Sequence, residues 1–355
     1  MRILITGICG FVGSSIAKQL KILNPNYKIL GIDNFCRNGS RLNIAVLENL
    51  DIKIYEGDIR FSEQVNKLPC CDWVIDAAAN PSVIAGFNGN SSTKDVLDHN
   101  LGATFNILEY CKKNNSGLIL LSTSRVYSIT LLNKLKLAVE NNAFCPTIDN
   151  NILGFTKSGI TEDFSTQAPI SLYGASKLAS ELLALEYHYA FNFPIYINRC
   201  GVLAGSGQFG KPDQGIFSFW INSYIRGKKL QYIGFNGTGH QVRDCLHPID
   251  LTNLIIKQLQ TTNHNHYSRI INVSGGIDSA ISLYNLSQWC LLKFGEHKVE
   301  SNPNSRLYDL PWVVLNSDKA YKEWKWKPLI SSQAIFKDIA EHALANENWL
   351  KISND

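Results

Sequence analysis

Charged residues are scarce in this sequence and do not gather by sign. Asp, Glu, Lys and Arg make up 18% of the 355 residues, against about 25% in an average globular protein. The 34 basic and 30 acidic side chains leave a net charge of +4, and no long run of Lys or Arg concentrates that excess. A disordered chain and a nucleic-acid-binding stripe are therefore disfavoured, while a mild positive charge suits an anionic small substrate.

Long apolar runs and paired cysteines are absent as well. No apolar stretch reaches about 18 residues, the length needed to span a membrane, and the N-terminus does not resemble a secretory leader. The nine cysteines are scattered and never spaced as Cys-x-x-Cys, a spacing typical of zinc and redox sites. We therefore expect a cytoplasmic protein with reduced thiols, no metal site, and neither a membrane nor a nucleic acid as partner.

The first half of the sequence alternates short β-branched runs with longer stretches of helical period. The predicted strands are residues 2–6, 28–33, 53–56, 73–76, 117–122 and 194–199. The clearest predicted helices are residues 10–23, 96–113 and 174–190. This alternation is typical of an α/β fold, a doubly wound parallel sheet of the Rossmann type with helices on both faces.

The alternation loosens after residue 199, where a Gly/Ser/Pro-rich stretch spans 201–215. We expect residues 1–200 to form the Rossmann domain and residues 201–355 to form mainly a smaller, interwoven α+β lobe. Part of this lobe, about 243–275, is predicted to return to the main sheet. The Asn- and Thr-rich segment 131–163 is predicted to be a long loop or excursion, and such loops are often functional.

A glycine-rich turn lies between the first predicted strand and the first predicted helix. Gly7 permits a tight turn, Gly10 lets the backbone approach a pyrophosphate, and Gly13 lets the helix pack against the strand. The pyrophosphate would lie at the helix N-terminus. Asp33 ends the second strand, where it would accept hydrogen bonds from the adenosine ribose and repel a 2′-phosphate. The motif therefore favours NAD over NADP, although the nearby Arg37 weakens that preference.

The spacing Gly-x-x-Gly-x-x-Gly resembles that of the extended short-chain dehydrogenases, which include the NAD-dependent nucleotide-sugar epimerases and dehydratases. Asp58 after the third strand and Asn100 in an Asn-plus-Gly helix also match these proteins, whereas Asp76 replaces their usual histidine. The cofactor-binding residues implied by the resemblance are Gly7, Gly10, Phe11, Val12, Gly13, Asp33, Asn34, Asp58, Ile59, Ala77, Ala78, Ala79, Asn100, Ser122, Tyr173 and Lys177.

The segment Tyr173-Gly174-Ala175-Ser176-Lys177 carries the catalytic resemblance. On a helix, Tyr173 and Lys177 share one face, so the ammonium would lie near the phenol and also contact the nicotinamide ribose. Nearby positive charge lowers a tyrosine pKa from about 10, which suits Tyr173 as the general base that takes a sugar hydroxyl proton. Thr123 would share a short hydrogen bond with the reacting oxygen, so the expected catalytic residues are Thr123, Tyr173 and Lys177.

The second half carries a substrate signal. Arg243 begins an Arg-Asp-x-x-His-x-x-Asp segment that resembles one in nucleotide-sugar epimerases and dehydratases, whose arginine holds a substrate phosphate. A guanidinium can grip a diphosphate with two parallel hydrogen bonds. The expected substrate-binding residues are Thr123, Gln214 and Arg243, the expected partner is a nucleotide-diphosphate sugar, and a homo-oligomer is expected.

Several interpretations stay open. Asp213-Gln214-Gly215, Ser124-Arg125-Val126-Tyr127 and residues 239–247 resemble the CDP-paratose 2-epimerases most, and UDP-hexose 4-epimerases are the nearest alternative. The related 4,6-dehydratases carry Asp-Glu directly after the catalytic threonine, where this chain has Ser124-Arg125. A non-catalytic NAD sensor or scaffold is the other alternative, but such proteins commonly lose the Tyr/Lys pair that this chain retains.

Overall fold

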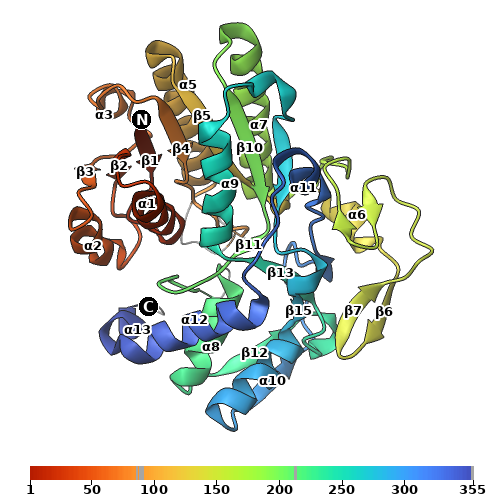
Figure 1. Ribbon diagram of the computed structural model, residues 1–355. Coiled ribbons are helices and arrows are strands. Elements are labelled where there is room, and N and C mark those ends of the chain that lie inside the picture. Colours follow the sequence, from red (N-terminus) through yellow and green to blue (C-terminus); the bar gives the residue numbers. More distant parts are fainter. Residues whose placement is uncertain (85–86, 88–91, 212–213, 353–355) are drawn as a thin grey trace.

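A seven-stranded parallel sheet organises the larger lobe of the computed structural model, which describes residues 1–84, 87, 92–211 and 214–352 (Figure 1). Its strands in spatial order are β14 (Ile270–Val273), β10 (Ile195–Cys200), β5 (Gly117–Thr123), β4 (Trp73–Asp76), β1 (Arg2–Thr6), β2 (Lys28–Asp33) and β3 (Lys53–Glu56). All neighbouring strands are parallel. The predicted doubly wound sheet is confirmed, and its strand order reverses between β1 and β4, where such sheets form a crevice.

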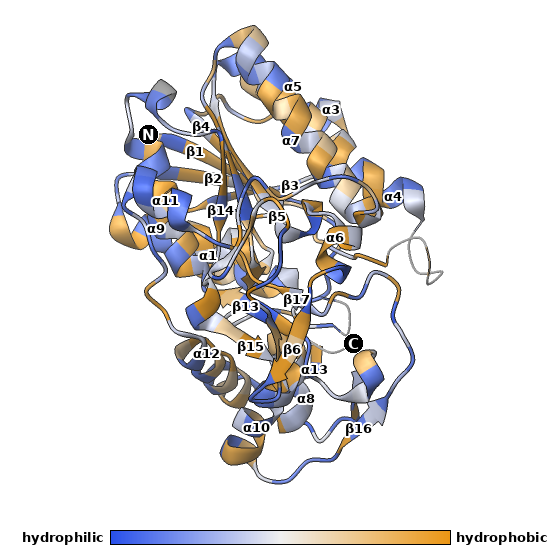
Figure 2. Ribbon diagram, turned by 90° about the vertical axis from the view of Figure 1, so that its right-hand side faces the viewer, coloured by the Kyte–Doolittle hydropathy of each residue, from blue (hydrophilic) through white to orange (hydrophobic). Residues whose placement is uncertain are grey.

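Two hydrophobic cores cover the two faces of this sheet. Ile3 and Ile5 of β1 pack into one core and Leu4 packs into the other, because successive side chains of a strand point to opposite faces. The covering helices are α1 (Phe11–Leu23), α9 (Pro248–Gln260) and α11 (Asp318–Trp324) on one face, and α5 (Ala103–Asn114) and α7 (Ser171–Phe191) on the other. Figure 2 shows the apolar strands enclosed between these helical layers. Burial on both faces explains why the strands read as apolar runs.

The predicted helix 96–113 is interrupted. The segment begins as α4 (Thr93–Leu97), passes through a π-helical turn at Asp98–Gly102, and continues as α5. Ser92 starts it with a reciprocal capping box, since its side chain accepts from the Asp95 N–H at 3.0 Å. π-Helical turns are frequent at functional sites, and this one carries Asn100.

The smaller lobe has its own sheet and core. The sheet contains β11 (Val202–Leu203), β13 (Val242–Leu246), β15 (Ala280–Ser282) and β17 (Trp312–Val313), and a separate pair joins β12 (Leu230–Ile233) to β16 (Val299–Asn302). The helices of this lobe are α8 (Ile216–Ile225), α10 (Leu283–Phe294), α12 (Ser332–Ala345) and α13 (Glu347–Ile352). The lobes are interwoven, because the chain leaves β13, forms α9 and β14 on the larger lobe, and then returns.

The segment 131–163 is more regular than expected. It continues from α6 (Ile129–Asn133) into a hairpin of β6 (Leu137–Glu140) and β7 (Ala143–Pro146), followed by β8 (Phe155–Thr156) paired with β9 (Gly159–Ile160). Asn141 and Asn142 turn the first hairpin with φ of 49° and 60°, the left-handed pair that two-residue hairpins favour. The Asn content therefore marks a turn. The segment packs on the smaller lobe, where the Phe144 N–H donates to the His240 carbonyl oxygen at 2.9 Å.

None of the helices in the described part of the chain is both long enough and apolar enough to cross a membrane.

Candidate active site

The glycine turn between β1 and α1 is built as a cradle. Gly7 has a φ of +61°, and its N–H donates to the Ile32 carbonyl oxygen at 2.9 Å. A Cβ at position 13 would lie 2.2 Å from the Gly7 carbonyl oxygen, so only glycine allows α1 to pack so closely. At Gly10, the N-cap of α1, a Cβ would meet only the Gly7 carbonyl oxygen, at 3.1 Å. The first N–H groups of α1 therefore face a space that a pyrophosphate can enter.

Asp33 lies against this turn, as predicted. Its carboxylate accepts hydrogen bonds from the Cys9 N–H at 2.9 Å and the Phe35 N–H at 2.8 Å. Burial raises the pKa of Asp33, while these backbone hydrogen bonds act in the opposite direction. Each carboxylate oxygen can accept a second hydrogen bond, so Asp33 can still receive ribose hydroxyls.

Asp58 and Asn34 line the same end of the cleft. The Asn34 amide donates to the Asp58 carboxylate at 3.0 Å, and Arg60 forms an ion pair with it at 2.6 Å. Burial favours the neutral acid, but the hydrogen bonds from Arg60 and Asn34 outweigh burial and lower the pKa of Asp58 to about 2. Asp58 is therefore a carboxylate at neutral pH, oriented by its neighbours.

Asp76 supports the loop that follows β4. It accepts from the Thr6 hydroxyl at 2.6 Å and from the Thr104 hydroxyl at 3.1 Å. The Thr6 oxygen in turn accepts from the N–H groups of Ala77 and Ala78, both at 3.0 Å. A buried carboxylate, in the place of the usual histidine, therefore holds the backbone of Ala77 and Ala78, which are two predicted cofactor-binding residues.

Asn100 has a supporting position. It accepts from the Asn80 N–H at 2.8 Å, and its amide donates to the Asn80 carbonyl oxygen at 3.1 Å and the Ser176 hydroxyl at 3.0 Å. Asn80 lines the cleft, whereas Asn100 is buried behind it. The structure thus gives Asn100 the role of joining the loop after β4 to helix α7, and its predicted contact with a cofactor stays a prediction.

Thr123 and Tyr173 both line the cleft, but the electrostatic surroundings of Tyr173 differ from those expected. Burial raises the pKa of Tyr173, whereas its hydrogen bond with Thr123 and the charge of Arg125 act to lower it. The pKa of Tyr173 is thus raised, not lowered as predicted, and the predicted effect of Lys177 on it stays a prediction. The charges that act on Lys177 come instead from Asp76 and Glu181.

Lys177 is 2% exposed, and burial lowers its pKa. No residue in the described part of the chain forms a hydrogen bond or an ion pair with its ammonium group. A buried ammonium without a hydrogen-bond partner is costly unless a ligand satisfies it.

A buried ion pair, missed in the sequence, lies beside these residues. The Arg199 guanidinium donates to Glu181 from Nε at 3.1 Å and from Nη2 at 2.7 Å, and the Ser122 hydroxyl donates to the same carboxylate. Arg199 also donates to the Tyr127 hydroxyl at 3.3 Å. Glu181 could have been noticed in the sequence as a neighbour of the site, because it lies four residues after Lys177, one turn along the same face of the helix.

The predicted substrate residues lie at different places in the cleft, which has a volume of about 1500 Å³. Arg243 donates to the carbonyl oxygens of Val242 at 2.7 Å and Leu310 at 2.8 Å, and it lies 3.8 Å from the Asp309 carboxylate. Gln214 accepts a hydrogen bond from Arg37, on the cofactor side. That contact turns Arg37 toward the smaller lobe. Asp213 lies outside the described residues.

Residues 3–274 match the model of the NAD dependent epimerase/dehydratase family. The chain belongs to this family. It is accordingly an enzyme, and NAD is its cofactor.

Individual relatives of this epimerase/dehydratase differ in their substrates. The CDP-paratose 2-epimerase of Salmonella typhi is 28% identical over 296 residues, 81% of this chain and 82% of the relative. The UDP-glucuronate 4-epimerase of Thermodesulfobacterium geofontis is 27% identical over 360 residues, 98% of this chain and 95% of the relative. The crystal structure of UDP-glucose 4-epimerase from Bifidobacterium longum shares the fold, with a TM-score of 0.78 at 22% identity, covering 98% of this chain and 100% of that one.

The residues at the glycine turn fit NAD. The glycine turn leaves open the space that a pyrophosphate needs, and Asp33 is oriented beside it. Lys177, whose ammonium has no hydrogen-bond partner among the described residues, would suit a ribose hydroxyl, but it is not among the residues that line the cleft. When bound, NAD accepts a hydride from the substrate and returns it.

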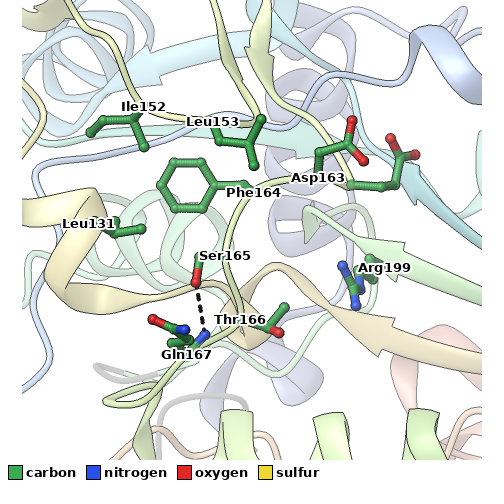
Figure 3. A pocket seen from close by; sticks show the side chains of 10 residues that line it. Leu131, Ile152, Leu153, Asp163, Phe164, Ser165, Thr166, Gln167 and Arg199 are labelled. Atoms are coloured by element: carbon green, nitrogen blue, oxygen red, sulfur yellow. Dashed lines mark hydrogen bonds between the residues drawn. The ribbon is translucent and has the colours of Figure 1, made fainter.

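A second, smaller cavity of about 440 Å³ lies beneath the segment 131–163 (Figure 3). Leu131, Ile152 and Phe164 form its apolar side, and Glu162 and Arg199 also line it. Glu162 accepts a hydrogen bond from the Asn272 N–H at 2.6 Å. Arg199 thus connects this cavity to the Glu181 ion pair.

Proposed function

We propose that the enzyme is an epimerase of a nucleotide-diphosphate sugar that acts at C2, as the name of the Salmonella relative describes. The observation that carries this proposal is that Thr123, Tyr173 and Arg243 line one cleft, while Lys177 is buried on the same helix as Tyr173. A candidate base, its hydrogen-bond partner and a candidate phosphate-binding guanidinium would then act together in this cleft.

The chain's own residues would act in sequence. Arg243 would bind the diphosphate, and Tyr173 would take the proton of the sugar hydroxyl while the hydride leaves the same carbon for NAD. Thr123 would hold the reacting oxygen, and Lys177 would hold the nicotinamide ribose. After the keto-sugar turns over in the cleft, the hydride returns to its other face and Tyr173 gives the proton back.

Epimerisation is favoured over dehydration by the acids present. Eliminating water from the sugar requires an acid and a base near the catalytic threonine, and this chain has Ser124-Arg125 there. The carboxylates that line the described part of the cleft are Asp33, Asp58, Asp95 and Asp309. Asp309 faces Arg243, and Asp58 pairs with Arg60.

A UDP-hexose 4-epimerase is the second candidate, because a UDP-glucuronate 4-epimerase aligns over 98% of this chain. One experiment separates the two: purified protein is incubated without added NAD with a panel of CDP- and UDP-linked sugars, and the C2 and C4 configurations are followed by proton NMR. Inversion at C2 of a CDP-sugar supports the proposal, inversion at C4 of a UDP-sugar supports the second candidate, and inversion at neither contradicts both.

The variant Tyr173→Phe provides the matched test of the mechanism. The ring still packs but the proton acceptor is gone, so turnover should fall by about 10²–10⁴-fold while the fold and copurified NAD persist. Thr123→Val should lose less, because Thr123 carries no proton. Wild-type turnover in Tyr173→Phe would contradict the assignment of the site.

Assembly and compartment remain predictions. We propose a homo-oligomer because α5 and α7 expose the large apolar side chains of Phe105, Leu182, Tyr189 and Phe191, and light scattering of the purified protein tests this. The nine free thiols agree with the cytoplasm, and cell fractionation tests that prediction.

A further inference from the structure

Gln241 carries a buried hydrogen-bond acceptor that the protein leaves open. This residue lines the cleft directly before β13, and its side-chain Nε2 donates to the Ile233 carbonyl oxygen at 3.4 Å. A carbonyl oxygen only accepts hydrogen bonds, so this contact turns the amide nitrogen toward Ile233 and the amide oxygen Oε1 away from it. Oε1 is buried, and no group in the described part of the chain donates to it.

A second glutamine of the cleft shows the contrast. Gln231 also lines the cleft, but its Nε2 donates to the Glu300 carboxylate at 3.0 Å and its Oε1 accepts from the Asn302 amide at 3.2 Å. A buried acceptor without a donor is costly and is uncommon in native proteins. The open acceptor of Gln241 therefore points to a donor that arrives with a ligand.

Gln241 lies close to the predicted phosphate-binding residue. The intervening Val242 packs into a separate hydrophobic core, so the side chains of Gln241 and Arg243 leave the strand on the same face. Residues two apart on a strand are separated by about 7 Å. If Arg243 holds a diphosphate, the group next to that diphosphate comes within reach of Gln241.

The direction of β13 identifies this group. The last residue of the strand, Leu246, packs into a core of the seven-stranded sheet. At the other end, Gln241 contacts β12, and its backbone carbonyl oxygen accepts from the Leu283 N–H at 3.2 Å, where α10 begins. Both elements lie at the end of the smaller lobe away from the large sheet (Figure 1). The reacting sugar must lie at Tyr173 in the larger lobe, so the nucleoside extends from Arg243 toward Gln241.

We propose that Gln241 selects the base of the nucleotide, with Oε1 accepting a hydrogen bond from the exocyclic amine of cytosine. Ile233 and Leu283, which contact Gln241, are apolar residues of the cleft wall and suit the face of a base. Cytosine carries an amine donor where uracil, like thymine, carries a carbonyl oxygen, so uracil would set two acceptors against each other. The inference rests on the proposed function, because it takes the diphosphate to lie on Arg243.

The first test needs no variant and no sugar. NAD-loaded wild-type protein is titrated in a calorimeter with CDP, with UDP, and with CDP whose amine carries two methyl groups and therefore donates no hydrogen bond. CDP should bind about tenfold more tightly than either of the other two. Binding of UDP or of the dimethylated CDP as tight as that of CDP overturns the inference.

The second test removes the acceptor. Gln241→Met keeps the length of the side chain, so its affinity for CDP should fall about tenfold while its affinity for UDP stays unchanged. Gln231→Met is the matched control and should keep the wild-type preference, because both amide atoms of Gln231 already have partners in the protein. An unchanged preference in Gln241→Met, or an equal loss in Gln231→Met, overturns the inference. Equal losses of CDP and UDP affinity in Gln241→Met would assign the donor to the ribose and also overturn it.

The two proposals fail in different ways. Inversion at neither C2 nor C4, with a preference for CDP that depends on Gln241, would contradict the proposed function and keep the role of Gln241. Inversion at C2 of a CDP-sugar, with the same preference in wild type and Gln241→Met, would do the reverse.

Discussion

Removing the charge of Glu181 should destabilise the protein strongly. In the wild type the side chains of Glu181 and Arg199 are 1% and 6% exposed, and three hydrogen bonds from the guanidinium end on this carboxylate. Glu181→Gln keeps the shape but leaves Arg199 as an uncompensated buried cation beside the Tyr127 hydroxyl. Breaking a buried ion pair from one side typically costs about 3–5 kcal/mol.

The size of the effect on thermal unfolding follows from the chain length. An unfolding entropy of about 2.1 cal/mol/K per residue over 355 residues gives about 0.75 kcal/mol/K. The Tm of Glu181→Gln should therefore fall by about 4–7 °C, measured by circular dichroism at a fixed, saturating NAD concentration, because bound cofactor itself raises Tm.

Two further variants make this prediction sharp. Glu341→Gln breaks an exposed ion pair, since the side chains of Lys337 and Glu341 are 64% and 62% exposed. The Tm of this variant should barely change. The double variant Glu181→Met/Arg199→Met removes both buried charges and should recover most of the lost stability. Equal Tm changes in Glu181→Gln and Glu341→Gln, or a double variant less stable than Glu181→Gln, would refute the reasoning.

Three other predictions follow from particular contacts. Gly13→Ala places a Cβ 2.2 Å from the Gly7 carbonyl oxygen, so copurified NAD, assayed after denaturation, should disappear; normal NAD content would contradict the packing of α1. Asp33→Ala should weaken NAD binding roughly tenfold to a hundredfold in calorimetry, because a charged hydrogen bond contributes about 1.5–3 kcal/mol. Burial raises the pKa of Asp244 to about 6 in the folded state, above its unfolded value. Ionisation of Asp244 therefore lowers the free energy of unfolding, by up to about 3 kcal/mol. This stability is fully lost above pH 6 and is regained below about pH 4. When urea unfolding is measured from pH 7 to pH 4.5, the wild type should become more stable as the pH falls, and Asp244→Asn should not. The same pH dependence in both proteins would contradict this prediction.

Local chemistry explains what could be predicted from the sequence. Four strands, β1 to β4, begin and end at the predicted residues, because apolar runs bounded by turns depend on near neighbours. The glycine turn could also be predicted from the sequence, because the close packing at position 13 requires glycine whatever the rest of the fold. Helical spacing also predicted that Tyr173 and Lys177 share one helix, and both lie in α7. The hairpin turn at Asn141-Asn142 also depends on near neighbours, so these two asparagines could have predicted it.

Contacts between distant segments decided the rest. Glu181 and Arg199 meet only because α7 packs beside the end of β10. The sequence pattern of neither element predicts that these two residues form a pair. Helical spacing suggested that Lys177 sets the charge around Tyr173, whereas in the folded protein the charges of Asp76 and Glu181 act on Lys177. Electrostatic interactions depend on distance and burial in three dimensions, so the residue types of the site could be predicted from the sequence, while their charges and partners depended on the fold.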